Sequence, residues 1–359
     1  MTLLTPLGWT DAFQRKWEQH GITGAQPARV VADFGTSLKV MTPELHTAEL
    51  SGKLAHYSPH EDTPKVGDWV AARLSDNGNA VIEAVIPRQS EIARKVAGRQ
   101  TKKQVIAANV DVAFIVIALD NDFSVERLKR FLYQVSINNI APVIVLNKAD
   151  KVTDLLPYTE QLNDLHLPII VSTATAGAGV EEMLGFIGSG QTAILLGSSG
   201  VGKSTLTNYL LGSSTQKTHA VRASDSSGMH TTVHRELFML AGGGLLIDAP
   251  GIRELQLWGS EENLDESFDD VVSIAKRCRL STCRHGDEPG CAIRAALASG
   301  VLDSAHYASY LKMKRELAEL KKRSDVQERR GNKVSHANKR KQAAEGLKEM
   351  REDEEDALS

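Results

Sequence analysis

The chain of 359 residues is long for one hydrophobic core and predicts two or three domains. Its composition, 42% hydrophobic and 24% charged, is that of a soluble globular protein, and its net charge of −3 argues neither for nor against a nucleic-acid partner. No apolar run approaches the roughly 18 residues of a membrane span, and the N-terminus has no signal-peptide core. We therefore expect a cytoplasmic protein without a membrane partner.

The first 98 residues predict an irregular arm over 1–27, with one short helix over 10–20, followed by an OB-like β-barrel over 28–98. Short β-like segments recur between turn signals, and Asp76-Asn77-Gly78-Asn79 is a strong hairpin signal. These segments are 29–34, 37–42, 47–54, 68–74 and 80–86. Such barrels often bind nucleic acid, but many serve only as scaffolds, and both alternatives stay open here.

A change of pattern follows. Residues 89–108 are rich in Arg and Lys and predict a basic linker. Beyond them, strands alternate with helices, which predicts an α/β domain over 99–262 with a mostly parallel sheet covered on both faces. The expected strands are 111–119, 142–146, 169–171, 192–196, 235–240 and 245–247, and the expected helices are 125–138, 180–187 and one from 204 to 212.

A phosphate-binding loop connects the expected strand 192–196 to the next helix. Its residues fit G-x-x-x-x-G-K-[ST] and are Gly197, Ser198, Ser199, Gly200, Val201, Gly202, Lys203 and Ser204, with Thr205 following. Glycines let backbone N–H groups converge on phosphates, and the helix N-terminus adds positive potential. Lys203 is expected to reach the β- and γ-phosphates, and Ser204 to ligate Mg²⁺.

A guanine site is predicted by N-K-x-D at the end of the strand 142–146. Its residues are Asn147, Lys148, Ala149 and Asp150, and the next strand ends in Ser172 and Thr173. The Asp150 carboxylate can accept from both the N1–H and the 2-amino group of guanine, a pairing that adenine cannot offer. Discrimination should be large, because the wrong base leaves buried polar groups unpaired. The alternative is a polar turn after a strand.

The sequence Asp248-Ala249-Pro250-Gly251 fits D-x-x-G, so we expect Asp248 to contact Mg²⁺ through water and the Gly251 amide to meet the γ-phosphate. Residues 213–234 are polar and predict a mobile switch loop. Thr231 or Thr232 there could supply a second Mg²⁺ ligand, and Thr232 is our choice. Because N-K-x-D precedes the phosphate loop, the order of motifs predicts a circularly permuted GTPase domain.

A zinc-binding domain, mostly α-helical, is predicted over 263–330. Cys278, Cys283, His285 and Cys291 supply three thiolates and an imidazole, the set of a closed structural zinc site. A helix over 305–320 follows. Residues 305–342 hold 12 Lys and Arg against 4 Asp and Glu, whereas 343–359 hold 2 against 7, which predicts a basic and then acidic tail over 331–359. A basic run of this kind is either a solvated face or an RNA-binding surface.

Taken together, these features resemble the ribosome-small-subunit-dependent GTPase A family of bacterial circularly permuted GTPases, over nearly the whole chain. The segments that carry the resemblance are 67–70, 108–111, 147–150, 197–205, 228–232, 248–251 and the four zinc ligands. The resemblance implies a cytoplasmic GTPase that binds the small ribosomal subunit late in its assembly, touches rRNA and hydrolyses GTP much faster on that particle. We expect a monomer, because nothing in the sequence suggests a coiled-coil seam.

The resemblance also points to His230 as the residue that positions or activates the attacking water, with His234 in reserve. Ile252 follows D-x-x-G and cannot hydrogen-bond to water, so intrinsic hydrolysis should be slow. Two other interpretations remain: a GTP-gated module that binds RNA or regulates translation with incidental hydrolysis, and an ATPase with an RNA-binding barrel. Asp150 argues against the ATPase.

Overall fold

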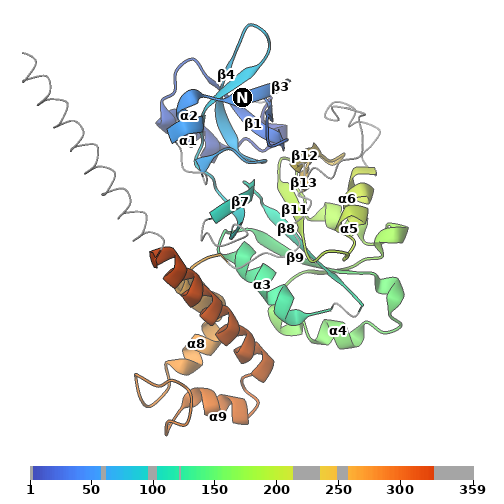
Figure 1. The fold of residues 1–359 in the computed structure, drawn as a ribbon. Coiled ribbons are helices and arrows are strands. Elements are labelled where there is room, and N and C mark those ends of the chain that lie inside the picture. Colours follow the sequence, from blue (N-terminus) through green and yellow to red (C-terminus); the bar gives the residue numbers. More distant parts are fainter. Residues whose placement is uncertain are drawn as a thin grey trace, which may run out of the picture.

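The structure, a computed structural model, describes residues 3–57, 62–95, 103–120, 123–212, 235–248 and 258–326. A small β-barrel at the N-terminal end is followed by an α/β domain and then by a group of helices that carries the cysteine cluster (Figure 1). This arrangement confirms the predicted fold class.

The barrel has five strands and closes on itself. They are β1 (Gln26–Asp33), β2 (Leu38–Met41), β3 (Leu45–Leu50), β4 (Trp69–Leu74) and β5 (Ala80–Val85). Hydrogen bonding runs β1-β2-β3-β5-β4, and β4 returns to pair with β1. The predicted strand over 47–54 was wrong at its end, because the chain turns into helix α2 (Gly52–Tyr57) instead, which buries Leu54 in the barrel core.

The N-terminal arm is packed against the barrel. It contains the short η1 (Thr5–Leu7) and the expected helix, α1 (Asp11–His20). Trp9 and Phe13 lie against the fully buried Trp69 of β4, and the Trp9 and Trp69 ring centroids are 4.7 Å apart in an edge-on arrangement. Edge-to-face aromatic pairs of this kind add to the free energy gained from burial alone. The arm is therefore part of the barrel's hydrophobic core.

The α/β domain has the predicted, mostly parallel sheet. Its order is β10-β9-β8-β11-β13-β12, and only β12 runs antiparallel to its neighbour β13. The strands are β8 (Val112–Ala118), β9 (Ala141–Asn147), β10 (Ile169–Val171), β11 (Thr192–Leu196), β12 (Arg235–Met239) and β13 (Leu245–Asp248). The helical segments are α3 (Val125–Ser136), η3 (Ala149–Lys151), α4 (Leu156–Glu160), η4 (Asn163–Leu165), η5 (Ala174–Ala176), α5 (Val180–Gly185) and α6 (Lys203–Gly212).

Both faces of this sheet are covered because its strands are apolar on both sides. Along β8, Ile115 packs in one cluster with Leu128 of α3, whereas Phe114 packs in another with Leu206 of α6. Alternate side chains of a strand point to opposite faces, so each face meets its own helices. This burial fixes the strand ends that carry the functional motifs.

The predicted basic linker over 89–108 was wrong. Strands β6 (Glu91–Lys95) and β7 (Lys103–Ala108) form an antiparallel pair. Buried apolar residues such as Ile92 and Ile106 hold it against the α/β core, while basic residues occupy the less buried positions. The Arg and Lys content hid this apolar pattern at the level of sequence.

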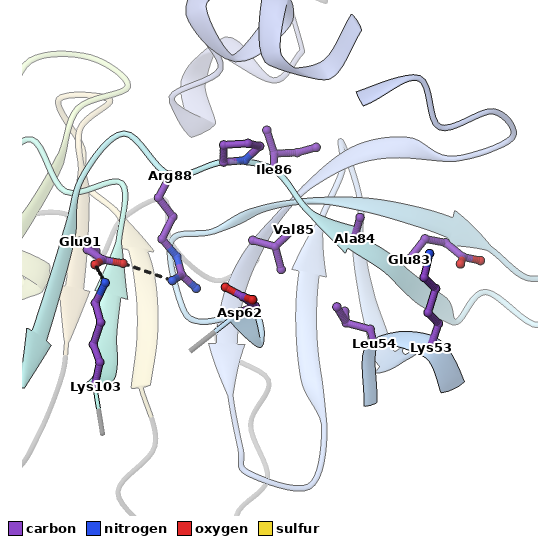
Figure 2. A pocket seen from close by; sticks show the side chains of 11 residues that line it. Lys53, Leu54, Asp62, Glu83, Ala84, Val85, Ile86, Arg88, Glu91 and Lys103 are labelled. Atoms are coloured by element: carbon purple, nitrogen blue, oxygen red, sulfur yellow. Dashed lines mark hydrogen bonds and ion pairs between the residues drawn. The ribbon is translucent and has the colours of Figure 1, made fainter. Parts of the chain in front are cut away.

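A hollow of about 510 Å³ lies between this hairpin, α2 and β5 (Figure 2). Its charged lining pairs acids with bases: Glu91 contacts both Arg88, at 3.2 Å, and Lys103. Its remaining charged residues are Lys53, Asp62 and Glu83, which leaves three bases and three acids around it. The hollow therefore has no net charge that would select an anion or a cation.

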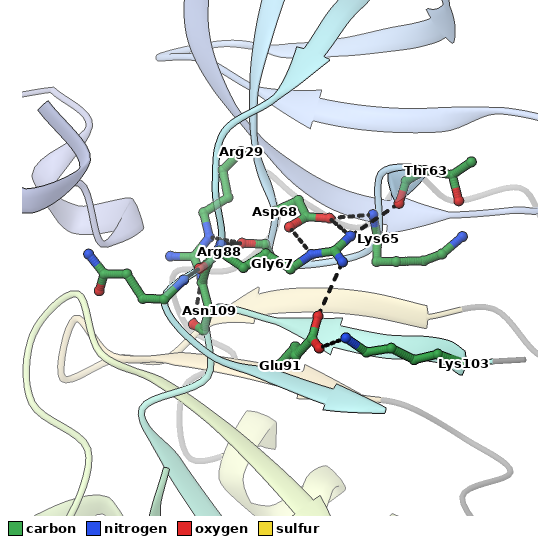
Figure 3. A network of polar contacts seen from close by, with 10 residues as sticks. Arg29, Thr63, Lys65, Gly67, Asp68, Arg88, Glu91, Lys103 and Asn109 are labelled. Carbon is green, nitrogen blue, oxygen red and sulfur yellow. Dashed lines mark hydrogen bonds and ion pairs between the residues drawn. The ribbon is translucent and has the colours of Figure 1, made fainter. Parts of the chain in front are cut away.

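A buried polar network joins the barrel to the α/β domain (Figure 3). Arg29 donates from Nε to the carbonyl of Gly67 at 3.1 Å, and from Nη2 to Asn109 at 3.2 Å and to the Thr192 hydroxyl at 2.9 Å. Burial lowers the pKa of the Arg29 guanidinium to about 10, and the charges of Asp111 and Asp68 oppose that shift. Arg88 in turn holds the Asp68 carboxylate at 2.8 and 2.9 Å.

The barrel and the α/β sheet are also continuous through their backbones. Strand β1 pairs with β12, so that Ala32 lies opposite Glu236 and Asp33 opposite Arg235. The barrel strands thereby extend the central sheet into a single hydrogen-bonded sheet of 11 strands. The sequence of neither segment indicates this pairing.

The C-terminal helices build a separate core. They are α7 (Glu261–Ser267), α8 (Asp269–Ala275), α9 (Ala292–Ala298) and a helix over residues 304–326, which contains the expected helix 305–320. Tyr133 of α3 is buried in the same cluster as Leu264, Phe268 and Met313. Within the described ranges, no helix combines the length and the apolar character needed to cross a membrane.

Candidate nucleotide-binding site

The predicted nucleotide motifs meet at one edge of the sheet. Asn147 ends β9, Ser172 follows β10, Gly197 follows β11 and Asp248 ends β13. These strands are parallel, so their carboxyl ends lie at the same edge, where ligands bind in open α/β sheets. Residues far apart in the sequence are therefore brought together as the motif spacing predicted.

The phosphate loop depends on its glycines. Gly197, Gly200 and Gly202 have φ angles of 148°, 80° and 100°, which side chains rarely adopt. A Cβ atom on Gly197 would lie 2.3 Å from the Val116 carbonyl, and one on Gly202 would lie 2.2 Å from Asn147 Nδ2. Only glycine permits this approach of the loop to the neighbouring strands.

Lys203 is held over the loop by backbone carbonyls. Its Nζ donates to Gly197 at 2.7 Å and to Ser198 at 2.6 Å. Burial lowers the pKa of the Lys203 ammonium, and the opposite charge of Asp248 raises it again. Burial likewise raises the pKa of the Asp248 carboxyl, against the attraction of Lys203. The Lys203 ammonium and the Asp248 carboxylate thus attract each other at the sheet edge where phosphates and Mg²⁺ are expected.

The other residues of the loop differ in their exposure to solvent. Ser199, Gly200 and Ser204 are exposed, whereas Val201 is buried beneath the loop with 3% of its surface accessible. Thr205 lies in the first turn of α6 and is half-buried. The exposed hydroxyl of Ser204 suits the expected role of a metal ligand.

The N-K-x-D segment has two parts with different environments. Asn147 is 1% exposed, donates from Nδ2 to the Val201 carbonyl at 2.7 Å and accepts the Ala174 N–H at 3.0 Å. It therefore ties the phosphate loop to the segment after β10. Asp150, in contrast, is exposed on η3 and its carboxylate is accessible to a base.

The remaining base-site residues shape the backbone around Asp150. Lys148 has a left-handed φ of 63°, and its Nζ contacts Asp120 Oδ2 at 2.7 Å. The Ala149 N–H donates to the Ser172 carbonyl at 3.1 Å, and Ser172 Oγ donates to the Ala178 carbonyl at 2.9 Å. Thr173 bridges to Ala178. Asp120 was missed at the level of sequence, although an acid directly after the strand ending at residue 119 was a usable signal.

Some predicted site residues lie outside the part of the chain that the structure describes. The switch-loop residues Thr231, Thr232, His230 and His234 lie outside the described residues, as do Gly251 and Ile252 of the D-x-x-G segment. The tail over 331–359 lies outside them too.

The cysteine cluster is assembled as predicted. The Sγ atoms of Cys278, Cys283 and Cys291 and a ring nitrogen of His285 all lie within 4.8 Å of one another. His285 Nδ1 is 3.5 Å from the Cys278 sulfur and 3.7 Å from the Cys291 sulfur. Four ligands about 2.0–2.3 Å from a central tetrahedral ion would lie about 3.3–3.8 Å apart. The two His285 distances fall in that range, so the set is compatible with zinc.

Comparison with known proteins agrees with this geometry. A family model described as RsgA GTPase matches residues 85–258. The protein named small ribosomal subunit biogenesis GTPase RsgA from Syntrophotalea carbinolica is 39% identical over 331 residues, which cover 89% of this chain and 91% of the relative. The protein of the same name from Opitutus terrae is 40% identical over 336 residues, covering 90% and 92%.

Solved structures show the same fold. The crystal structure of YjeQ from Thermotoga maritima is similar with a TM-score of 0.60 and 26% identity, covering 82% of this chain and 99% of that one. The structure of YloQ, described as a circularly permuted GTPase, is similar with a TM-score of 0.57 and 21% identity over 84% of this chain and 97% of that one.

Proposed function

This chain belongs to the RsgA GTPase family, and from that premise we propose that it hydrolyses GTP to GDP and phosphate while assisting late maturation of the small ribosomal subunit. The observation that carries this proposal is the meeting of the phosphate loop, N-K-x-D and Asp248 at one sheet edge. We place the protein in the cytoplasm, as a monomer that contacts rRNA when it docks on the subunit.

In this site, one group of residues binds the base and another binds the phosphates. Asp150 reads guanine, while Asn147 and Lys148 fix the position of the loop that carries it. Backbone N–H groups of residues 199–205 and the Lys203 ammonium bind the phosphates and stabilise the charge that develops on them in the transition state. Ser172 and Thr173 support the base pocket from the segment after β10.

We assign the Mg²⁺ site to Ser204 and Thr232 as direct ligands and to Asp248, which would contact the ion through water. When bound, the ion would neutralise charge on the β- and γ-phosphates. The donor set fits, because hydroxyl and carboxylate oxygens are the ligands that Mg²⁺ prefers, and both Ser204 and Asp248 lie beside Lys203. The Gly251 amide would contact the γ-phosphate.

We assign the positioning of the attacking water to His230, because residues 228–232 match the family's switch-loop motif, and Ile252 cannot hydrogen-bond to water. Replacing His230 with Ala should lower the subunit-stimulated turnover by about 100-fold or more, the range of general acid–base contributions, while GTP affinity stays nearly unchanged. Turnover is measured with and without purified small subunits. His20→Ala, at an exposed helix end, is the control.

The outcomes of this assay separate the alternatives. Absence of any stimulation by the subunit would refute the maturation role and favour the GTP-gated RNA-binding module. A normal stimulated rate in His230→Ala would remove His230 from the mechanism and direct attention to His234.

We assign one structural zinc ion to Cys278, Cys283, His285 and Cys291. Cys283→Ser should reduce the zinc content from about one equivalent to less than half an equivalent. The backbone amides of the C-terminal helices should then exchange their hydrogens faster, since structural zinc contributes directly to folding. Elemental analysis and hydrogen exchange measure the two effects. Ser281→Ala, two residues away and exposed, should change neither. Full protection in zinc-free protein would contradict a structural role.

A further inference from the structure

Helix α3 contacts the phosphate loop through Arg127. Its Nη1 donates to Ser198 Oγ at 3.0 Å. The carbonyl of the same serine accepts from Lys203 Nζ at 2.6 Å. Hydrogen bonds thus lead from the α3 guanidinium through one loop residue to the ammonium that reaches the phosphates. A shift of α3 would move the serine that orients Lys203.

The same helix carries the contacts with the C-terminal helix over 304–326, which lies beside α3 in Figure 1. Arg130 and Glu316 form an ion pair at 2.9 Å, and Lys312 and Glu126 form another at 2.7 Å. The Arg130 and Glu316 side chains are only 22% and 33% exposed, so this pair is the better shielded of the two. Glu126 and Arg130 belong to the helical turn that also carries Arg127.

Further contacts hold α3 against residues 258–260, which precede α7. Tyr133 is buried and its hydroxyl donates to the Ser260 carbonyl at 3.0 Å, while Gln134 donates to the Trp258 carbonyl at 2.7 Å. A Cβ atom on Gly259 would lie 2.2 Å from the Tyr133 oxygen, so the two segments are in direct contact. Packed cores of this density move as units and do not deform continuously.

We propose that Arg127 is a positioning residue for the phosphate loop, and that docking of the C-terminal helix on α3 acts through it to set the loop's preference for GTP over GDP. The proposal rests on the proposed GTPase function. In GTP the Lys203 ammonium contacts both the β- and the γ-phosphate, whereas in GDP it contacts only the β-phosphate. Displacing Lys203 therefore weakens the binding of GTP more than that of GDP. By linkage, bound GTP changes the docking of the C-terminal helix by the same factor.

The contact at the loop is tested by nucleotide affinities. Arg127→Ala and Ser198→Ala should each lower the affinity for GTP about tenfold, which is the effect of losing one hydrogen bond to a charged group. Each should lower the affinity for GDP about twofold. The double variant should be no worse than Arg127→Ala alone, because Ser198→Ala removes a contact that Arg127→Ala has already removed. Arg127→Lys should restore part of the GTP preference, since an ammonium can also donate to the hydroxyl. Competition with a fluorescent GDP analogue gives all the affinities.

The contact between α3 and the C-terminal helix is tested by a charge swap. Arg130→Glu and Glu316→Arg should each lower the ratio of GTP to GDP affinity, up to about fivefold, as expected for a partly exposed ion pair. The double swap should restore the ratio. The matched control is the Arg73 and Glu83 pair of the barrel, at 3.2 Å, where the same swaps should leave the ratio unchanged.

These measurements need no ribosomal subunit, so the two proposals can fail separately. Wild-type protein that does not bind GTP would overturn the proposed function. Wild-type protein that binds GTP normally, with variants that lower the melting temperature but leave the GTP to GDP ratio unchanged, would overturn the coupling through α3 alone. Additive effects of Arg127→Ala and Ser198→Ala would overturn the positioning role of Arg127.

Discussion

GTP affinity should fall by at least about 100-fold when Lys203 is replaced with Met, and turnover should become undetectable. Two charge-assisted hydrogen bonds to phosphates are lost, each contributing roughly 1.5–3 kcal/mol. The carbonyls of Gly197 and Ser198 lose their donor as well. Met preserves most of the apolar stem, so the packing around the loop is disturbed little. Titration with a fluorescent GTP analogue measures the loss.

The control for this variant is Lys53→Met, an exposed lysine on α2 of the barrel. It removes the same charge from the protein without touching the sheet edge, so affinity and turnover should match those of wild type. If Lys203→Met bound GTP as tightly as Lys53→Met, the loop at residues 197–204 would not be the phosphate site.

The base specificity should change when Asp150 is replaced with Asn. The carboxylate accepts from the N1–H and 2-amino groups of guanine, whereas the amide offers one acceptor and one donor. GTP affinity should therefore fall by at least about 100-fold, because the 2-amino group would face another donor. Xanthosine triphosphate has a carbonyl oxygen at that position, and its affinity should rise. Competitive displacement of a fluorescent GDP analogue compares the two nucleotides.

Asp154→Asn provides the control, four residues further along. Asp154 is exposed and its Oδ1 accepts the Leu156 N–H at 2.9 Å, so it shapes the local turn without reaching the base pocket. Its nucleotide preference should be that of wild type. Equal affinity of the wild-type protein for ATP and GTP would argue against the guanine site and in favour of the ATPase interpretation.

The chemistry of the site was predictable because it is carried by short contiguous motifs. The positive φ angles of the loop require Gly197 and Gly202, and Asp150 is the last residue of the four-residue N-K-x-D motif. The Cys278, Cys283, His285 and Cys291 set was also readable, since its ligands lie within one segment. In each case the information is local, and strand alternation was enough to bring the motifs to one edge.

The contacts between motifs were not predictable in the same way. Asn147 was expected among the residues of the guanine site, and the structure shows that its amide connects Val201 to Ala174. The Arg127 contact with Ser198 spans 71 residues of sequence. Such pairs depend on which helix packs beside which loop, and a polar residue on a helix does not reveal its partner.

By itself, the sequence determined the barrel, the permuted order of nucleotide motifs and the ligand set of the cysteine cluster, because turn residues, glycines and thiolates act over a few positions. Only the tertiary structure decided that β6 and β7 pair, that β1 joins β12, and that α3 lies between the phosphate loop and the C-terminal helix. Strand edges and helix faces accept many partners, and their choice follows from how the buried surfaces of the whole chain fit together.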